Sequence, residues 1–383
     1  MTDTGTMILE NARIVLAEHV IERGYVVVDK GVIVEAGEGR APERGQDLCG
    51  DLLLPGLVEL HTDHLEAHVT PRPKVQWDSL AAVISYDAQI ATSGITTVLD
   101  SLRVWREEGS GEQDGQAAAL SAAIDRARDA GLLRVEHFLH LRCEVPMPKV
   151  VEDAADLIGR PDVRLLSLMD HTPGQRQFRD PQKLREYYRG KGGGTDAELD
   201  IMFARRIENH AQYAADNYRG LVALADKHGT PLASHDDTTA DHVEDAVRDR
   251  VAIAEFPTTV GAAAALHASG IKVMMGAPNL IRGGSHSGNV ATAELARAGM
   301  LDLMSSDYVP SSLLIAALRL PAESNKYDLP SAVRTVSKTP AEAVGFSDRG
   351  EIAAGKRADL IRVHQAEDAV AVRSVWSGGR RVA

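Results

Sequence analysis

A histidine and an aspartate stand two residues apart where a short apolar stretch ends. The stretch follows Pro55 and Gly56 and runs into His61 and Asp63. On an extended backbone, residues i and i+2 point to the same face, so the pair can offer one nitrogen and one oxygen to a single divalent cation. A strand that ends in polar surface residues would look the same, so a metal site requires further ligands elsewhere in the chain.

Further candidate ligands stand at the ends of other apolar stretches. Glu144 ends the alternating segment 135–145 on the face expected to point inward, where it could bridge two metal ions; an ion pair with Arg142 is the alternative. Two more strand ends carry a histidine beside an aspartate. Because neighbours on a strand face opposite sides, we expect only the imidazoles of His171 and His235 to bind, since imidazole is the better zinc ligand.

Asp307 follows the last predicted strand and is the candidate catalytic residue. A lone carboxylate there can bind metal and also accept the proton of an activated water. The predicted metal ligands are His61, Asp63, Glu144, His171, His235 and Asp307. They offer nitrogen and oxygen but no thiolate, a set that suits one or two divalent ions, with zinc expected. Such a metal lowers the pKa of a bound water and so supplies hydroxide near neutral pH.

The glycine-rich segment 276–289 is a second motif that could do chemistry. Glycines let a backbone approach a ligand closely, and Arg282 adds a fork of donors that matches phosphate oxygens. We therefore expect a small, anionic, phosphorylated substrate to bind here, although a plain flexible turn is the alternative. The predicted substrate contacts are Arg72, Arg142, Asn279, Arg282, Gly283, Gly284 and His286.

Bulk properties limit the classes of function. The chain has 383 residues and a formal net charge of −13, which argues against nucleic-acid or acidic-membrane binding but not against a local anion pocket. The two cysteines, Cys49 and Cys143, lie far apart, as expected in a reducing compartment. We find no secretory signal and no apolar run of about 18 residues. A cytoplasmic enzyme is expected, and a homo-oligomer is possible.

Strand and helix patterns alternate through the middle of the chain. The predicted strands end at Leu60, Asp100, Glu144, Asp170, Ser234, Glu255, Met275 and Ser306. This alternation predicts a (β/α)8 barrel over residues 55–346, in which catalytic groups collect at the carboxyl ends of the strands. The longest interruption, 174–198, is rich in Arg, Lys and Gly; we expect a loop over the barrel mouth or a simple surface insertion.

Both ends of the chain consist of short strand patterns broken by turns. Neither residues 1–54 nor residues 347–383 contain enough strands to form a stable sheet alone. We therefore expect the two ends to assemble one small β-sandwich domain beside the barrel.

These features together resemble the amidohydrolase superfamily, and residues 350–360 are similar to its usual return into the β domain. More specifically, five segments resemble the PhnM family of the carbon–phosphorus lyase pathway: 54–63, 70–73, 87–97, 275–289 and 305–312. The resemblance implies hydrolysis of α-D-ribose 1-methylphosphonate 5-triphosphate, which releases diphosphate and leaves the 5-phosphate.

The chain departs from the superfamily pattern in two places. Most members carry His-x-His on the first strand, whereas Asp63 takes the second position here, as in the PhnM family. His64 then follows where that family usually has Asn, and could be a ligand, a proton relay or a neutral substitution. On strand six, the segment with Glu255 replaces the usual histidine, which favours His171 as a substitute ligand.

Two other functions are compatible with these residues. An amidohydrolase that acts on an amide or a cyclic amidine would use the same metal ligands but would not need the segment 282–289. A metal-bound, non-catalytic subunit of a phosphonate-degrading assembly would need no proton acceptor at Asp307.

Overall fold

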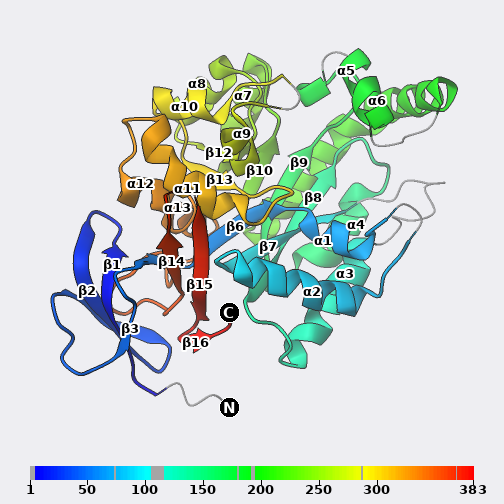
Figure 1. Ribbon diagram of the computed structural model, residues 1–383. Coiled ribbons are helices and arrows are strands. Elements are labelled where there is room, and N and C mark those ends of the chain that lie inside the picture. Colours follow the sequence, from blue (N-terminus) through cyan, green and yellow to red (C-terminus); the bar gives the residue numbers. More distant parts are fainter. Residues whose placement is uncertain are drawn as a thin grey trace.

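Two eight-stranded sheets organise the chain (Figure 1). The middle of the sequence forms a parallel sheet surrounded by helices, and the two ends together form a second, mostly antiparallel sheet. This computed structural model describes residues 5–72, 75–104, 116–178, 181–190, 195–285, 288–367 and 369–383.

The parallel sheet is the predicted (β/α)8 barrel. Its strands pair in sequence order and are β6 (Leu57–Thr62), β7 (Ile95–Arg103), β8 (Glu136–Glu144), β9 (Val163–Met169), β10 (Leu232–His235), β11 (Ile253–Glu255), β12 (Lys272–Gly276) and β13 (Leu303–Ser305). A parallel bridge between Thr62 and Asp307 joins the first strand to the residues that follow the last strand. The sheet therefore nearly closes, and the fold class predicted from the sequence is confirmed.

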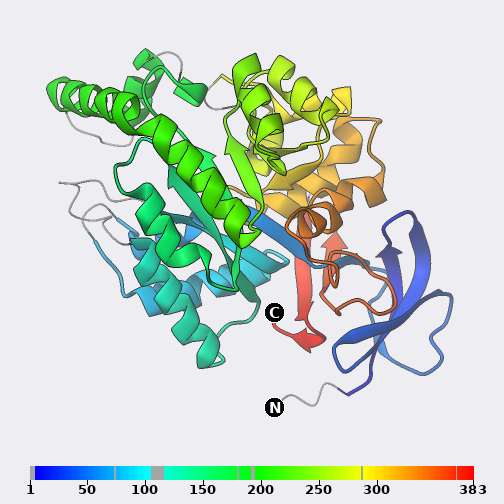
Figure 2. The same ribbon diagram turned by 180° about the vertical axis from the view of Figure 1, so that it is seen from behind.

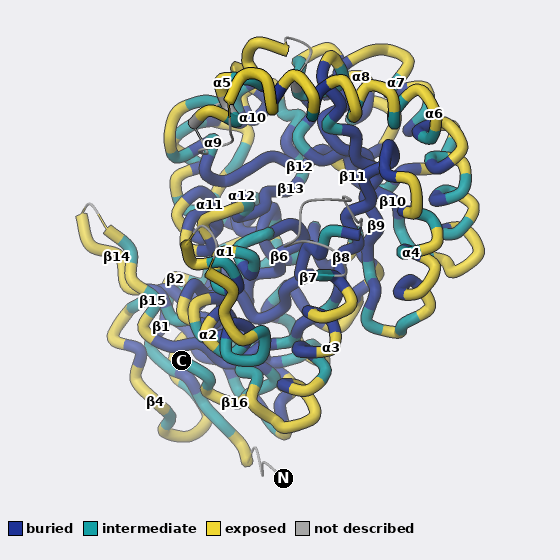
Figure 3. The backbone as a smooth tube through the Cα atoms, turned by 90° about the vertical axis from the view of Figure 1, so that its right-hand side faces the viewer, coloured by how far each residue is buried: buried dark blue, intermediate teal, exposed yellow. Residues whose placement is uncertain are grey.

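Burial explains why these strands form where they do. All six residues of β6 are buried, and the strands appear as the buried centre of the molecule in Figure 3. One set of side chains, which includes Leu60, Leu99 and Leu165, packs in a small cluster of its own. The larger cluster fills the space between the strands and the helices. Strands that are buried on both faces are apolar runs, and the sequence shows such runs here.

Helices follow the strands and cover the outside of the barrel. In chain order they are α1 (His64–Val69), α2 (Ser79–Thr92), α3 (Gln116–Asp129), α4 (Val150–Ile158), α5 (Pro181–Gly190), α6 (Asp196–His228), α7 (Ala240–Arg248), α8 (Val260–Ala268), α9 (Ala277–Arg282), α10 (Thr292–Ala298), α11 (Ser312–Glu323), α12 (Leu329–Arg334) and α13 (Lys338–Ala343). Within the described part of the chain, no helix combines the length and apolar composition that a membrane crossing requires.

The segment 174–198, which we expected to be a loop, is largely helical where it is described. It contains a short 3-10 helix, Arg176–Phe178, and α5, and it leads into the 33-residue α6 (Figure 2). Leu184 of α5 is buried against Phe203 of α6, which gives this polar helix an apolar contact. The expectation of a loop was therefore wrong for residues 176–178 and 181–190, and residues 179–180 and 191–194 lie outside the described part.

The second sheet joins the two ends of the chain. Its strands are β1 (Met7–Val15), β2 (Val20–Asp29), β3 (Val32–Glu38), β4 (Gln46–Asp47), β5 (Leu52–Pro55), β14 (Leu360–Gln365), β15 (Val370–Ser377) and β16 (Arg380–Arg381). The two ends are joined by the antiparallel pairing of β5 with β14 and by an antiparallel bridge between Val32 and Arg357. The division at residues 54/55 and 346/347, and a sandwich form for this unit, stay predictions.

Candidate metal centre and anion-binding cavity

The carboxyl ends of the barrel strands surround a cavity of about 1090 Å³. All six predicted metal ligands line it: His61, Asp63, Glu144, His171, His235 and Asp307. Four predicted substrate contacts also line it: Arg142, Asn279, Arg282 and Gly284. Arg72 and Gly283 are not among its lining residues, and His286 lies outside the described part of the chain. The strand ends thus bring most of the predicted residues to one place.

The carboxylate of Glu255 lies beside two histidines that come from different barrel strands, β6 and β10. His61 of β6 places Nδ1 3.0 Å from Oε1 of Glu255, and His235 of β10 places Nδ1 2.9 Å from Oε2 of the same residue. The two imidazole rings stack, with centroids 5.5 Å apart. Burial lowers the pKa of His235 to about 3 and holds that of His61 well below its usual value. Both rings are therefore neutral at neutral pH.

Glu144 at the end of β8 holds the third histidine. Its Oε2 lies 2.7 Å from Nδ1 of His171, and its Oε1 accepts the backbone N–H of His171 at 2.5 Å. Burial acts to raise the pKa of Glu144, but the charge and hydrogen bonds of His171 outweigh it and lower the pKa to about 2. The alternative partner, Arg142, instead places Nη1 3.5 Å from Oδ2 of Asp63. Glu144 is thus positioned to orient His171.

Asp236 is a candidate ligand that the sequence argument excluded. Its Oδ2 lies 3.5 Å from Nε2 of His235 and 4.0 Å from Nε2 of His171. These three side chains offer ligand atoms that all lie within 4.8 Å of one another. The rule that neighbours face opposite sides fails here, because Asp236 lies beyond β10 and has a φ of +56°, in the left-handed region.

Asp307 has the environment of a proton acceptor. Burial raises its pKa to about 7, and the charge of Asp63 adds to this, while Arg142 acts in the opposite direction. The backbone carbonyl of Asp307 accepts the hydroxyl of Thr62 at 2.6 Å, which fixes the residue beside the first strand. A carboxylate with a pKa near neutrality can both take and return a proton.

Arginines stand around the metal-ligand group. Arg103, Arg142, Arg206 and Arg282 all line the cavity. Arg206, which was not predicted from the sequence, comes from α6 and donates to the hydroxyl of Tyr188 at 2.5 Å. Arg103 was not predicted either, and its Nε lies 2.7 Å from a carboxylate oxygen of Glu66. Among the described residues, four arginines thus line the cavity together with five carboxylates, which belong to Asp63, Glu66, Glu144, Asp236 and Asp307.

The two glycines after α9 form the C-terminal end of that helix. The backbone N–H of Gly283 donates to Leu280, and that of Gly284 donates to the carbonyl of Asn279 at 2.9 Å. Gly283 has a φ of +81°, the usual geometry of a residue that ends a helix. The side chain of Asn279 bonds to the backbone at Val290 and Thr292. In this segment, Arg282 is consequently the residue best suited to an anion.

His64 and Glu255 lie where the sequence departs from the superfamily pattern. Nε2 of His64 lies 3.1 Å from the side-chain oxygen of Gln89, which also contacts His68. That nitrogen is engaged by Gln89, although the residue lines the cavity. Glu255, noted only as a missing histidine, is instead the carboxylate that joins His61 to His235.

The donor set fits a divalent metal. It combines imidazoles with carboxylates, and none of the lining residues is a cysteine. Nitrogen and oxygen donors of this kind suit zinc and similar borderline ions. In the described part of the chain, Nδ1 of His61 is a buried atom with no hydrogen-bond partner, although it lies 3.0 Å from Oε1 of Glu255. That ring nitrogen is thus available as a ligand.

Comparisons with known proteins agree with this arrangement. A model of the amidohydrolase family matches residues 87–383. The α-D-ribose 1-methylphosphonate 5-triphosphate diphosphatase of Escherichia coli (strain K12) is 45% identical over 379 residues, which cover 98% of this chain and 100% of that protein. An imidazolonepropionase of Deinococcus deserti is 23% identical and covers 94% of this chain and 92% of that protein.

Solved structures show the same fold. A molinate hydrolase has a TM-score of 0.65 at 14% identity, and the match covers 100% of this chain and 95% of that one. The N-acetyl-D-glucosamine-6-phosphate deacetylase of Mycobacterium smegmatis has a TM-score of 0.61 at 17% identity, with 99% of each chain covered. The chain therefore belongs to the amidohydrolase family of metal-dependent hydrolases, in the branch of the Escherichia coli diphosphatase.

Proposed function

We propose that the protein is a zinc-dependent diphosphatase. Its substrate is α-D-ribose 1-methylphosphonate 5-triphosphate, which it cleaves to the 5-phosphate and diphosphate. The observation that carries the proposal is the presence of metal-ligand side chains and several arginines in one cavity at the strand ends. The full-length similarity to the Escherichia coli diphosphatase supports the choice of substrate.

The metal would be held by the imidazoles and carboxylates at the strand ends. We assign His61, His171 and His235 as nitrogen ligands, and Asp236 joins the carboxylates predicted at Asp63, Glu144 and Asp307. A divalent ion bound there lowers the pKa of water and offsets negative charge on the phosphates. One or two ions would be compatible with this number of donors.

Residues of the chain itself would accept the proton of the attacking water and bind the negative phosphate oxygens. Water adds across the anhydride bond between the α and β phosphates, and Asp307 accepts the proton that the attacking water loses. That proton can then pass to the departing diphosphate. Arg282 and Arg142 would hold the phosphate oxygens, because a guanidinium fork matches them and stays charged at all relevant pH values.

The arginines also separate this function from the alternatives. Hydrolysis of an amide or cyclic amidine would use the same metal centre but would gain nothing from charges at Arg206 and Arg282. A non-catalytic subunit would not need an acceptor such as Asp307, whose pKa is raised to about 7. We also propose a cytoplasmic location, which the two free cysteines, Cys49 and Cys143, support.

A phosphorus NMR experiment tests the substrate. Zinc-loaded protein is incubated with the ribosyl triphosphate, and the signals of diphosphate and the 5-phosphate should grow together. ATP, which shares the triphosphate but not the methylphosphonate, serves as the comparison substrate and should react more slowly. A zinc-loaded protein that leaves the ribosyl triphosphate intact but hydrolyses a cyclic amidine would overturn the proposal.

Metal analysis tests the ligand set separately. His235→Ala removes an imidazole from the group of three ligand atoms, and Asp63→Ala removes the predicted ligand that lies between β6 and α1. Each variant should bind clearly less zinc than the wild type after the same loading and desalting. Lys272→Ala, an exposed change on β12, should bind a wild-type amount. Full zinc content in both ligand variants would contradict the assignment.

A further inference from the structure

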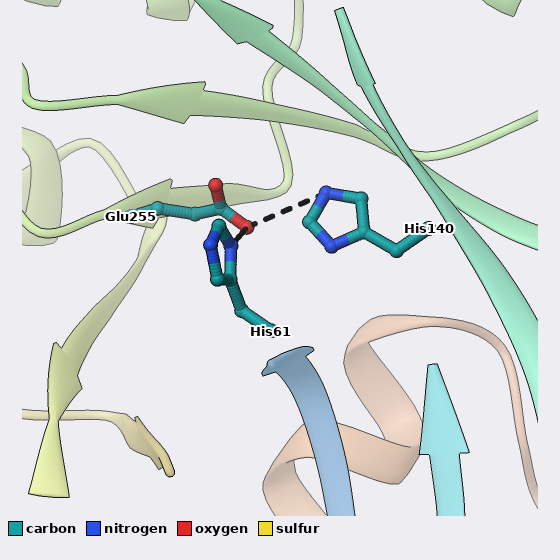
Figure 4. A group of neighbouring side chains, drawn as sticks. All are labelled: His61, His140 and Glu255. Carbon is teal, nitrogen blue, oxygen red and sulfur yellow. Dashed lines mark ion pairs between the residues drawn. The ribbon is translucent and has the colours of Figure 1, made fainter. Parts of the chain in front are cut away.

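The helices α5 and α6 form one wall of the cavity. The metal-ligand side chains stand on the barrel strands or just after them, as His61 does where it lies with His140 beside Glu255 (Figure 4). Tyr188 and Arg206 instead enter the cavity from helices outside the parallel sheet. The α5–α6 wall is defined by the lining residues Leu184, Tyr188, Met202 and Arg206. None of them takes part in the proposed cleavage.

Arg206 and Tyr188 form the polar part of this wall. Nη1 of Arg206 donates to the hydroxyl of Tyr188 at 2.5 Å, and its Cζ lies 5.5 Å from the centre of the tyrosine ring. Both side chains are half-buried. A guanidinium carries five N–H groups, so it can bond to a protein hydroxyl and to an anionic ligand at the same time. The ring contact limits its rotation, so Arg206 presents a positioned positive charge to the cavity.

Apolar side chains lie close to this charge. Leu184 of α5 is buried against Phe203 of α6, and Tyr188 and Met202 pack against the same pair. This cluster holds α5 on α6 and also supplies the apolar surface of the wall, since Leu184 and Met202 line the cavity. The α5–α6 wall therefore places a guanidinium and a phenol beside an aliphatic chain and a thioether.

The wall that carries Arg282 lies elsewhere around the barrel. Its helix, α9, follows β12, whereas α5 and α6 follow β9, three strands away in an eight-stranded sheet. In the same segment as Arg282, the cavity is lined by the polar side chains of Asn279 and Ser285. Arg206 and Arg282 thus belong to separate walls of one cavity, and a ligand with two anionic ends can contact both.

The substrate of the proposed function has such a shape. Its triphosphate is attached at C5 of the ribose, and its methylphosphonate is attached at C1. The cavity of about 1090 Å³ is at the upper end of the range for ligand pockets, so it has room for both ends. A triphosphate presents oxygens only, whereas a methylphosphonate presents charged oxygens and a methyl group on the same phosphorus. The α5–α6 wall offers a partner for each.

We propose that Arg206, held by Tyr188, is a specificity-determining residue that binds the methylphosphonate group. Its guanidinium bonds to the phosphonate oxygens, and Met202 contacts the methyl group. The inference rests on the proposed function for the identity of the substrate. It assigns to α5 and α6 the recognition of a group that the reaction leaves unchanged.

Binding of the triphosphate end is the competing role for Arg206. The apolar neighbours argue against it. A chain of phosphates placed against Leu184 and Met202 would lose water from oxygens that gain no hydrogen bond there, and such a loss is costly. A methyl group placed at the same surface loses nothing and buries apolar area.

Calorimetric titration of the zinc-loaded protein with two 5-phosphates tests the inference. One is α-D-ribose 1-methylphosphonate 5-phosphate, and the other is ribose 5-phosphate, which lacks the methylphosphonate. Neither contains an anhydride bond, so the measurement needs no turnover. The wild type should bind the first roughly 10-fold or more tightly, the scale of one hydrogen bond between charged groups.

Three variants locate the source of this preference. Arg206→Ala should bind the two ligands about equally, because only the affinity for the methylphosphonate falls. Tyr188→Phe keeps the ring but loses the hydroxyl that Arg206 contacts, so it should reduce the preference less. Arg219→Ala is the matched control, since this exposed arginine of α6 pairs with Asp216 and does not line this cavity. It should keep the wild-type preference.

The outcomes separate this inference from the proposed function. Equal affinities of the wild type for the two ligands would overturn the inference, even if Arg206→Ala did not fold. A folded Arg206→Ala that loses affinity for both ligands alike would overturn it as well. A wild type that prefers the methylphosphonate but leaves the ribosyl triphosphate intact would support the inference and count against the proposed function alone.

Discussion

Asp307 combines burial with a nearby carboxylate, and these conditions suit it to proton transfer. Burial and the charge of Asp63 raise its pKa to about 7. Asp307→Asn keeps the size and one oxygen but cannot accept a proton. We expect kcat to fall roughly 10²–10⁴-fold, the usual loss when general-base help is removed. Steady-state kinetics with zinc content measured on the same sample would check this.

The zinc content of Asp307→Asn should stay close to that of the wild type, because the imidazole ligands are unchanged. Near-normal turnover would identify a different proton acceptor. Asp236 would then be the first candidate, since burial raises its pKa to about 7 as well.

Arg282 is exposed and has few contacts that would make it structural. Its Nη1 lies 3.4 Å from the hydroxyl of Tyr308, at the long end of hydrogen bonding. Arg282→Ala should therefore leave Tm near the wild-type value. It should raise KM by roughly 10-fold or more, because a hydrogen bond to a charged group is worth about 1.5–3 kcal/mol.

Arg297→Ala is the matched control for this change. Arg297 is an exposed arginine of α10 that contacts Glu323 rather than the cavity. It should change neither KM nor Tm. A large loss of stability in Arg282→Ala with an unchanged KM would favour a structural role for that residue.

At the scale of elements, a buried charge cluster fastens α2 to the barrel. His137 of β8 places Nδ1 2.9 Å from Asp100 of β7 and Nε2 3.3 Å from Asp87 of α2. Burial acts to lower the pKa of His137, but the two carboxylates outweigh it and raise the pKa to about 9. The cluster thus holds an imidazolium between two strands and a helix.

This cluster should make stability depend on pH in alkaline solution. The pKa of His137 in the folded protein is above its unfolded value of about 6.5, so its contribution is complete below that pH. The contribution is lost as the pH rises through about 9. Denaturant unfolding between pH 7 and 10 should show a steeper loss in wild type than in His137→Gln. His19→Gln, at an exposed histidine, should keep the wild-type slope; equal slopes in all three proteins would contradict the prediction.

The sequence predicted the strands well because each is a buried apolar run. The strand ends expected at Glu144 and Glu255 are the last residues of β8 and β11. The helix α5 was missed because its sequence is mostly polar. Its apolar face comes from Leu184 and Tyr188, four residues apart, and only the contact with Phe203 shows where that face packs.

The candidate site was predictable in part for the same reason. The last residues of the barrel strands lie at the same end of the barrel. His61, His171 and His235 could therefore be grouped from the sequence alone. Asp236 could not be placed, because its direction depends on a left-handed backbone conformation. The position of Glu255 beside His61 and His235 could not be predicted from the sequence either, because it depends on which rings meet across the barrel interior.

At the scale of the whole molecule, the segment that leads from α13 back to the second sheet is bound to the amino end of a barrel strand. Glu136, the first residue of β8, accepts hydrogen bonds from Arg349 and Arg357, each at 2.6 Å. Glu136→Gln should therefore lower Tm by several degrees, because the side chain of Arg349 is buried and would lose one of its two ionised partners, keeping only Asp348. Differential scanning calorimetry would measure this.

The same variant should keep wild-type kcat and zinc content, because the cavity lies at the opposite ends of the strands. Glu22→Gln removes a comparable ion pair with Arg13 on the exposed surface and should change Tm little. If the two variants had equal Tm values, the contact at Glu136 would contribute no more than a surface pair.

The pairing of β5 with β14 has a consequence for how the protein is made. The side chains of Asp51 and Arg362, which bond across this junction, are 311 positions apart. Translation proceeds from the amino end, so β5 leaves the ribosome long before its partner exists. During that time, an apolar strand with an unpaired edge is open to other chains. We therefore expect nascent chains to depend on chaperones, and early termination before β14 to yield aggregates rather than a functional barrel.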